Sequence, residues 1–336
     1  MSNHPKELFT LNIEEVPANF IKFTTIHTFN GASLALENTP LWFEYQNGKV
    51  YITQEGHMGH GTEMDVSFFR DYNYTKGFKT LVTNVAEYLP NLKLVITSGM
   101  WNASIDLEAL KKRNILCCGT DTKTNSTAEL AWSLIMIGWR GLQTELQNMK
   151  DGNWQTTVGR GLKGNTLGIF GLGKQGLQVA NFGKAFGMKV IAWSHNLKKE
   201  DCDKVDVQYV TSSELFQLSD ILTIHTKLSD RTKNFIDKEK LKKMKKDSLL
   251  VNTSRGPIIK EEDLLDALKN KVIGCAALDV YDIEPLPKDH ILRSMTNVIL
   301  TPHIGYVSSE AYEKFFEGYV LAIEAFLYGN PINKLN

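Results

Sequence analysis

Three polar side chains of different chemistry each follow a short apolar run in the last third of the chain: Arg255, Glu284 and His303. Such runs are typical of buried parallel strands, and parallel sheets bind ligands at the carboxyl ends of their strands. We therefore expect the guanidinium, the carboxylate and the imidazole to meet at one edge of a sheet. An arginine can bind a carboxylate and a carbonyl oxygen together, and an imidazole can pass one proton near neutral pH.

A glycine-rich segment, Gly171-Leu-Gly-Lys-Gln-Gly176, directly follows another apolar run and precedes an expected helix. In this context Gly171 permits a tight turn, Gly173 lets a pyrophosphate approach the backbone, and Gly176 lets the helix pack closely on the strand. The free N–H groups at the start of the helix favour phosphate. Lys174 and Gln175 complete the predicted dinucleotide site. A dinucleotide beside a cation, a carboxylate and an imidazole indicates hydride transfer.

The segment after the second predicted strand bears on the choice of cofactor. A carboxylate is expected about 20 residues beyond the glycine loop, where it binds the ribose hydroxyls of NAD. The chain has Ser194, His195 and Asn196 there instead. Nothing would repel the 2′-phosphate of NADP, and His195, Asn196 or Lys198 could bind it, but no arginine follows the strand. The sequence leaves NAD and NADP open.

From about residue 165 onward, apolar strands alternate with helical segments, which is the pattern of a doubly wound α/β fold. The predicted strands cover residues 166–170, 189–193, 207–210, 221–225, 248–252, 274–280 and 298–301. Helices are predicted at residues 177–186 and 261–268.

Upstream, the pattern is less regular. Strands at residues 93–97 and 114–118 flank a helix at residues 106–112, and residues 126–147 are predicted to form one long helix. Residues 41–53 indicate a hairpin, because an Asn-Gly pair lies between aromatic, β-rich arms.

Composition excludes several classes of protein. The length of the chain, 336 residues, favours two domains. Lysine plus arginine (38) equals aspartate plus glutamate (38), which argues against nucleic acid and anionic membranes as partners. We find neither a secretory signal pattern nor an apolar segment long enough for a membrane span. The four cysteines and the two histidines of residues 56–61 lack metal-ligand spacing, so we expect no metal and a reducing cytoplasm.

From about residue 89 to its end, the chain resembles the D-isomer-specific 2-hydroxyacid dehydrogenases. The matching segments, in chain order, are residues 97–106, 126–130, 167–176, 252–257, 277–286 and 300–305. Their order and spacing together are highly specific. The first 85 or so residues depart from the family, because the aromatic hairpin stands where an opening strand and helix are usual.

This resemblance implies a two-domain α/β architecture. A doubly wound Rossmann domain at residues 119–304 would be inserted into a smaller substrate domain with a flavodoxin-like tendency, formed by residues 1–118 and 305–336. The active site would lie in the cleft between the domains. Family members are usually homodimers through the nucleotide domain, so we also expect a homodimer.

The resemblance also implies roles for individual residues. His303 would be the acid/base and Glu284 its partner, while Arg255 would bind the carboxylate and carbonyl of the substrate. Backbone N–H groups around three further residues would hold the carboxylate: Ser98, Gly99 and Met100. Three others would contact the cofactor, with Asp279 fixing the nicotinamide carboxamide: Asp279, Thr226 and Ser254.

We therefore predict an NAD(P)-dependent oxidoreductase that transfers hydride between nicotinamide C4 and C2 of a small 2-keto acid or D-2-hydroxy acid. One alternative is a formate dehydrogenase built on the same plan. Those enzymes usually carry glutamine before the catalytic histidine, where this chain has Pro302. The other alternative is a non-catalytic dinucleotide sensor, which would not need to keep an acid/base pair. The substrate side chain and the physiological direction stay open.

Overall fold

The computed structural model describes residues 92–100, 102, 105–121 and 124–336, together with the backbone of four strands nearer the N-terminus. The chain divides into two compact units. The larger unit is Asn125–Val307, and the smaller combines Met1–Thr124 with Ser308–Asn336. In the described part, no helix is both long and apolar enough to span a membrane.

A seven-stranded parallel sheet forms the centre of the larger unit. Its strands are β7 (Thr166–Phe170), β8 (Lys189–Trp193), β9 (Gln208–Tyr209), β10 (Ile221–Ile224), β11 (Leu249–Asn252), β12 (Cys275–Leu278) and β13 (Val298–Leu300). The order across the sheet is β13-β12-β11-β10-β7-β8-β9, with every neighbouring pair parallel. Each predicted strand is present, and its ends differ from the prediction by no more than about two residues. The doubly wound α/β fold is confirmed.

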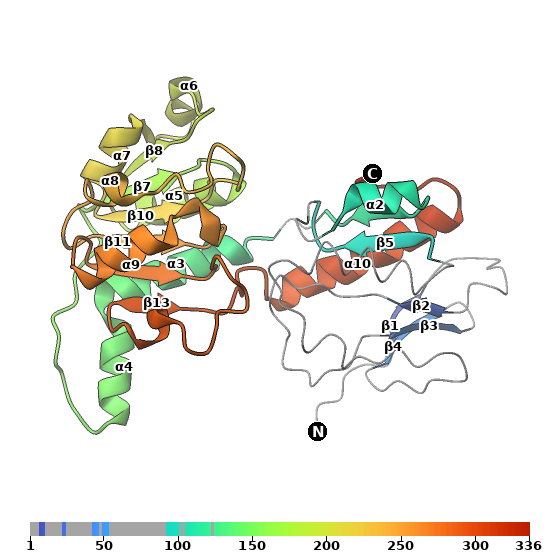
Figure 1. The fold of residues 1–336 in the computed structure, drawn as a ribbon, viewed down its shortest axis with the longest axis horizontal. Coiled ribbons are helices and arrows are strands. Elements are labelled where there is room, and N and C mark those ends of the chain that lie inside the picture. The colour runs from blue at the N-terminus through green and yellow to red at the C-terminus, as the bar shows by residue number, and fades with distance from the viewer. Residues whose placement is uncertain are drawn as a thin grey trace. The chain divides into compact units, whose positions relative to one another are not determined.

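Helices cover both faces of this sheet, as Figure 1 shows. On one face lie α3 (Ser126–Arg140) and α5 (Lys174–Ala185), and on the other α7 (Ser212–Leu218), α8 (Lys238–Leu241) and α9 (Glu261–Lys269). Successive side chains of a strand point to opposite faces of the sheet, so each strand can contact helices on both faces. Leu249 and Val251 of β11 pack in the cluster that holds Leu134 of α3, while Leu250 packs in the cluster that holds Leu264 of α9. Both faces are therefore apolar, as parallel strands require.

The strand order reverses between β7 and β10, the two strands at the centre of the sheet. The crossovers from these strands proceed to opposite sides, so the loops after their carboxyl ends diverge and leave room for a ligand. The glycine-rich loop follows β7, and Thr226 follows β10. The fold thus brings the predicted cofactor residues to the usual ligand-binding position of an open α/β sheet.

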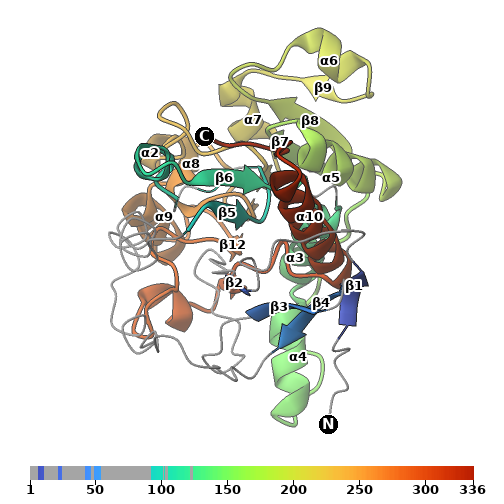
Figure 2. The same ribbon diagram turned by 90° about the vertical axis from the view of Figure 1, so that its right-hand side faces the viewer.

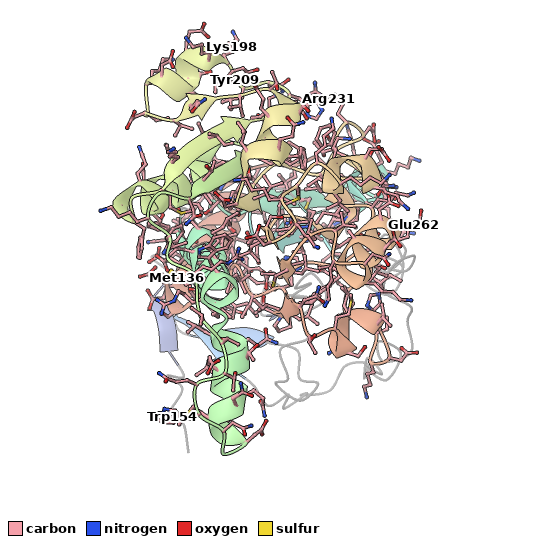
Figure 3. All side chains as sticks on the ribbon, turned by 90° about the vertical axis from the view of Figure 1, so that its left-hand side faces the viewer. Met136, Trp154, Lys198, Tyr209, Arg231 and Glu262 are labelled. Carbon is pink, nitrogen blue, oxygen red and sulfur yellow. The ribbon has the colours of Figure 1, made fainter. Side chains whose placement is uncertain are left out.

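The prediction of one long helix over residues 126–147 is wrong. The structure has two helices, α3 and α4 (Leu142–Lys150), separated by Gly141. Gly141 has φ of +66°, and its N–H bonds the carbonyl groups that end α3. An apolar pattern can continue across such a position, but the left-handed backbone cannot propagate a helix. The segment after the break is exposed, and Trp154 beyond α4 lies far from the sheet in Figure 3.

The described part of the smaller unit contains a parallel pair, β5 (Leu94–Thr97) and β6 (Leu116–Gly119), connected by α2 (Leu107–Lys112). The C-terminal helix α10 (Ser309–Leu327) packs against both strands (Figures 1 and 2). These elements confirm the predicted strand-helix-strand segment.

Nearer the N-terminus, four strands form an antiparallel sheet in the order β1-β4-β3-β2. They are β1 (Glu7–Thr10), β2 (Lys22–Thr24), β3 (Trp42–Gln46) and β4 (Lys49–Thr53). Strands β3 and β4 pair directly, which confirms the arms of the predicted hairpin. Its Asn-Gly turn and the histidines of residues 56–61 lie outside the described residues.

Candidate active site

Two of the predicted catalytic residues, His303 and Glu284, are in direct contact at the carboxyl edge of the sheet. Nδ1 of His303 lies 2.6 Å from Oε2 of Glu284, and both side chains are mostly buried. The other carboxylate oxygen, Oε1, accepts the backbone N–H of Tyr281 at 2.9 Å. The carboxylate is thus held from one side and orients the imidazole from the other. This arrangement leaves Nε2 as the ring nitrogen available for proton exchange.

The turn that carries His303 is organised by Asp279, which is fully buried at the end of β12. Its Oδ1 accepts the Thr301 hydroxyl at 2.6 Å and the Ile304 N–H at 2.9 Å, and its Oδ2 accepts the Gly305 N–H at 2.9 Å. Burial raises the pKa of Asp279, and these three bonds oppose that shift. His303 has φ of +55°, a conformation that such a bonded turn can maintain.

Arg255 directly follows the end of β11 and precedes the short helix η2 (Gly256–Ile258). Its Nη1 donates to the Ser254 carbonyl oxygen at 2.6 Å, while Asn252 donates from its side chain to the Arg255 carbonyl oxygen at 2.9 Å. Burial lowers the pKa of Arg255, and the nearby Glu284 carboxylate opposes that shift. Arginine stays charged under these conditions. The structure therefore places both His303 and Arg255 near Glu284.

Gly256 allows the ends of β11 and β12 to approach each other. A Cβ atom at position 256 would lie 2.6 Å from the backbone nitrogen of Asp282 and still closer to the carbonyl group of Tyr281. No side chain could fit there without moving the backbone between Tyr281 and Glu284. The close approach of the Arg255 and Glu284 segments thus depends on this glycine.

We expect Gly256→Ala to lower the free energy of unfolding by about 1–3 kcal/mol. The clash is with backbone, which cannot give way as a flexible side chain can. Equilibrium urea unfolding measures the change. The matched control is Gly161→Ala, because a Cβ at Gly161 would meet no described atom within 4 Å. Equal losses in the two variants would contradict the close-approach argument.

The glycine-rich loop joins β7 to α5 at the same edge of the sheet. The Gly171 N–H donates to the Trp193 carbonyl oxygen at 3.0 Å, and Gly176 packs against the Gly171 backbone. A Cβ at Gly173 would meet nothing described within 4 Å, so the start of α5 is open. Neither an acidic residue nor a side-chain cap occupies its first turn. The loop therefore fits the pyrophosphate of a dinucleotide.

The remaining predicted residues of the loop form the first turn of α5. Lys174 is exposed, whereas Oε1 of Gln175 is buried and has no hydrogen-bond partner within the described part of the chain. A buried polar atom without a partner is costly, and a bound ligand can supply one. Thr226 and Ser254 follow β10 and β11 at the same edge of the sheet. The Ser254 hydroxyl donates to the Thr226 carbonyl oxygen, and the Thr226 backbone lies against Gly171.

The residues after β8 lie beside an arginine that the sequence analysis missed. Nη2 of Arg231 donates to Oδ1 of Asn196 at 3.2 Å. Arg231 belongs to the segment between β10 and α8, so an arginine reaches the end of β8 although none follows that strand directly in the sequence. The useful signal was that β10 also ends at this edge of the sheet, close to β8 in the strand order.

Ser98, Gly99 and Met100 belong to the smaller unit and follow β5. The Ser98 hydroxyl lies 2.6 Å from the Tyr319 hydroxyl of α10, and the Gly99 N–H donates to Thr120 Oγ1 at 2.8 Å. Met100 is exposed. One of the three N–H groups predicted to bind a carboxylate is thus already engaged.

Within the described residues, no group of histidine, cysteine, aspartate and glutamate side chains could hold a metal ion. The four cysteines are free, and Cys117, Cys118 and Cys202 are buried. Burial raises the pKa of the Cys117 thiol to about 12, which keeps it protonated and unreactive.

The chain is similar in sequence and fold to several known proteins. A family model for the NAD-binding domain of D-isomer-specific 2-hydroxyacid dehydrogenases matches residues 132–305. A glyoxylate reductase from Thermococcus litoralis is 34% identical over 273 residues, which cover 76% of this chain and 82% of the relative. A hydroxypyruvate reductase from Thermotoga maritima is 35% identical over 237 residues, covering 69% and 76%. A D-lactate dehydrogenase from Aquifex aeolicus, solved with NAD and lactic acid, has 29% identity and a TM-score of 0.65, covering 74% and 80%.

Proposed function

The chain belongs to the family of D-isomer-specific 2-hydroxyacid dehydrogenases, and from that premise we propose that it interconverts a small 2-keto acid and the D-2-hydroxy acid with His303 as the acid/base. The observation that carries the proposal is the 2.6 Å contact of His303 with Glu284. The charge of the same carboxylate opposes the lowering of the Arg255 pKa by burial. A proton donor and a carboxylate-binding cation close together are what reduction of a 2-keto acid requires.

The nicotinamide cofactor, when bound, supplies the hydride that reduces the keto carbon. Glu284 holds Nδ1 of His303, so Nε2 is the atom that gives its proton to the keto oxygen. In the oxidative direction the same nitrogen takes the proton of the substrate hydroxyl. Glu284 stabilises the imidazolium in both directions and keeps the ring oriented.

Arg255 and the loop after β5 bind the acid end of the substrate in this proposal. The planar guanidinium can donate to the carboxylate and the keto oxygen together, which polarises the carbonyl. The Gly99 N–H is donated to Thr120, so Ser98 and Met100 are the more suitable donors for the carboxylate.

The residues that would hold the cofactor are the glycine loop from Gly171 to Gly176, Thr226, Ser254 and Asp279. A carboxylate offers about four acceptor sites. Asp279 is fully buried and uses three of them on the turn that carries His303, so contact of the fourth with the nicotinamide carboxamide requires that turn to open.

The experiment that tests this function is a panel of 2-keto acids assayed with NADH and NADPH separately. Glyoxylate, hydroxypyruvate, pyruvate and bulkier keto acids would each be mixed with protein, and cofactor oxidation followed by absorbance. We expect oxidation with at least one small 2-keto acid. Tight cofactor binding without oxidation of either cofactor across the panel would favour the sensor alternative. Reduction of NAD+ or NADP+ by formate in a separate assay, with no 2-keto acid reduced, would favour the formate dehydrogenase.

We further propose that the chain forms a homodimer through an arm, residues 142–158, that begins with α4. This arm carries exposed apolar side chains that a monomer would leave in water. They are Leu142, Leu146, Met149, Trp154 and Val158, of which Trp154 is 72% exposed. Glu145 bonds the backbone N–H groups of Thr156 and Thr157, which ties the returning chain to α4. The arm is therefore an ordered apolar surface suited to a second copy.

We expect light scattering after size exclusion to give the mass of two chains. The double substitution Leu146→Glu and Met149→Glu should shift it to one chain, because charges would be buried without partners. Gln143→Glu on the same helix adds charge at a polar exposed site and should leave the mass unchanged. A wild-type protein with the mass of one chain at assay concentration would refute the dimer.

A cytoplasmic location is part of the same proposal. Free cysteines that burial protects, including the neighbouring Cys117 and Cys118, are usual for proteins of a reducing compartment.

A further inference from the structure

The end of β8 is where the adenosine ribose of a dinucleotide is expected to bind. Its last residue, Trp193, pairs with Phe170 of β7 and accepts the Gly171 N–H, so Ser194 lies directly beside the glycine loop. A carboxylate here would bind the two ribose hydroxyls and would repel a 2′-phosphate. Ser194 carries no charge and does neither. The position therefore permits a phosphorylated ribose.

Two side chains after Ser194 are close to the cation Arg231. Because arginine can only donate, the atom of Asn196 that accepts from Nη2 is Oδ1, and the Asn196 amide N–H groups take no part in this contact. Burial first, and Arg231 second, lower the pKa of His195, which places the imidazole within the electrostatic reach of the guanidinium. In the described residues no carboxylate forms an ion pair with Arg231, although Asp230 precedes it. Its charge is available to an anion.

The backbone that presents Arg231 is well ordered by its neighbour Thr232, which is buried. The Thr232 hydroxyl donates to the Lys227 carbonyl oxygen at 2.7 Å and accepts the Ser229 N–H at 2.8 Å. These bonds close the turn between β10 and α8. A side chain on such a turn loses less conformational freedom when it binds a ligand. Arg231 and Lys198 both appear in the upper part of Figure 3.

Aromatic packing fixes the position of the His195 ring. The His195 ring lies 4.9 Å from the Trp193 ring and 4.9 Å from the Phe235 ring, measured between centroids. Trp193 and Phe235 stack at 5.4 Å. The segments after β8 and β10 thus form one preformed surface that carries a guanidinium, an imidazole and an amide.

We propose that Arg231, His195 and Asn196 bind the 2′-phosphate of NADP(H), and that the chain therefore prefers NADP(H) to NAD(H). The inference rests on the proposed function only in assuming that a nicotinamide dinucleotide binds at the glycine loop. A guanidinium can donate two parallel hydrogen bonds to phosphate oxygens, and the imidazole and amide supply further donors. NAD(H) would leave these donors facing water.

The test uses two fragments that need no turnover, adenosine 2′,5′-bisphosphate and AMP. Isothermal titration of the wild-type protein should show the bisphosphate binding about tenfold or more tightly than AMP, because hydrogen bonds between charged groups are the strong ones. Arg231→Ala should remove about tenfold in affinity for the bisphosphate and leave AMP binding nearly unchanged. The matched control is Lys269→Ala, which removes one positive charge from the exposed end of α9.

A second variant, Ser194→Asp, should reverse the preference, because a carboxylate repels the 2′-phosphate and binds ribose hydroxyls. Circular dichroism and thermal unfolding of each variant identify any loss of fold. Equal affinity of the wild-type protein for the two fragments would overturn the proposal, as would an unchanged ratio in a folded Arg231→Ala protein. A protein that shows the ratio but reduces no keto acid would refute the proposed reaction and leave this site intact.

Discussion

Replacing His303 by alanine is expected to lower turnover by about 10²–10⁴-fold, the usual contribution of a general acid or base. The physical reason is that Nε2 is the ring nitrogen left for the keto oxygen once Glu284 occupies Nδ1. Dinucleotide binding should persist, because the glycine loop takes no hydrogen bond from His303. Steady-state kinetics with the best keto acid of the panel measure the loss, and titration of the cofactor measures the binding.

The control for this variant is His290→Ala. His290 is also a partly buried histidine paired with a glutamate, since its Nε2 lies 3.3 Å from Oε1 of Glu261. It also accepts the Leu292 N–H, so its loss should reduce stability and leave turnover nearly unchanged. Near-normal turnover in His303→Ala, or an equal loss in both variants, would contradict the acid/base role.

Replacing Arg255 by alanine is expected to lower kcat/KM by about 10²–10³-fold, an effect like the loss of one preorganised donor that stabilises developing charge. The variant removes the cation proposed to polarise the keto group, and it leaves Glu284 without its nearby positive charge. Arg255→Lys should recover only part of the loss, because an ammonium cannot reproduce the two parallel hydrogen bonds. Kinetics with saturating cofactor measure each value.

Arg160→Ala is the matched control for the arginine substitutions. Arg160 pairs with Asp247 at 2.8 Å and lies 3.5 Å from the centre of the Trp139 ring, away from the residues gathered around Glu284. Its loss should lower stability slightly without changing kcat/KM. If Arg255→Ala retained the wild-type kcat/KM, the proposed substrate contact would be wrong.

The strands of the larger unit were predictable because each is a short apolar run buried on both sides. Leu249, Leu250 and Val251 show this clearly, since successive side chains enter different core clusters. Parallel strands of this kind end at one edge, so the convergence of Arg255, Glu284 and His303 also followed from the sequence. The structure shows that His303 and Glu284 meet and that Glu284 lies near Arg255.

The features that were missed depend on backbone conformation and on contacts between distant segments. The break after α3 was hidden because leucines and methionine continue the apolar pattern, yet beyond Gly141 these residues are exposed rather than buried. The contact between Arg231 and Asn196 joins residues 35 positions apart and forms only when the turns after β8 and β10 are in place. Sequence spacing alone does not contain it.

Asp279 has a structural role in addition to the one that the sequence implied. The resemblance implied a contact with the nicotinamide carboxamide, a role that concerns a ligand. The structure adds that its carboxylate bonds Thr301, Ile304 and Gly305, on both sides of His303. A buried carboxylate needs several donors, and the turn after β13 supplies them. The same residue therefore positions the proposed acid/base histidine, which no pattern of residue types revealed.

The most direct test of the proposed reaction follows the hydrogen that is transferred. Protein would be incubated with a 2-keto acid from the panel other than glyoxylate, whose product has no stereocentre, and with a reduced nicotinamide cofactor labelled with deuterium at C4 on the transferred face. The product would be examined by NMR and chiral chromatography. We predict a D-2-hydroxy acid that carries deuterium at C2. A product without deuterium at C2, or no product with any small 2-keto acid, would contradict the proposed hydride transfer.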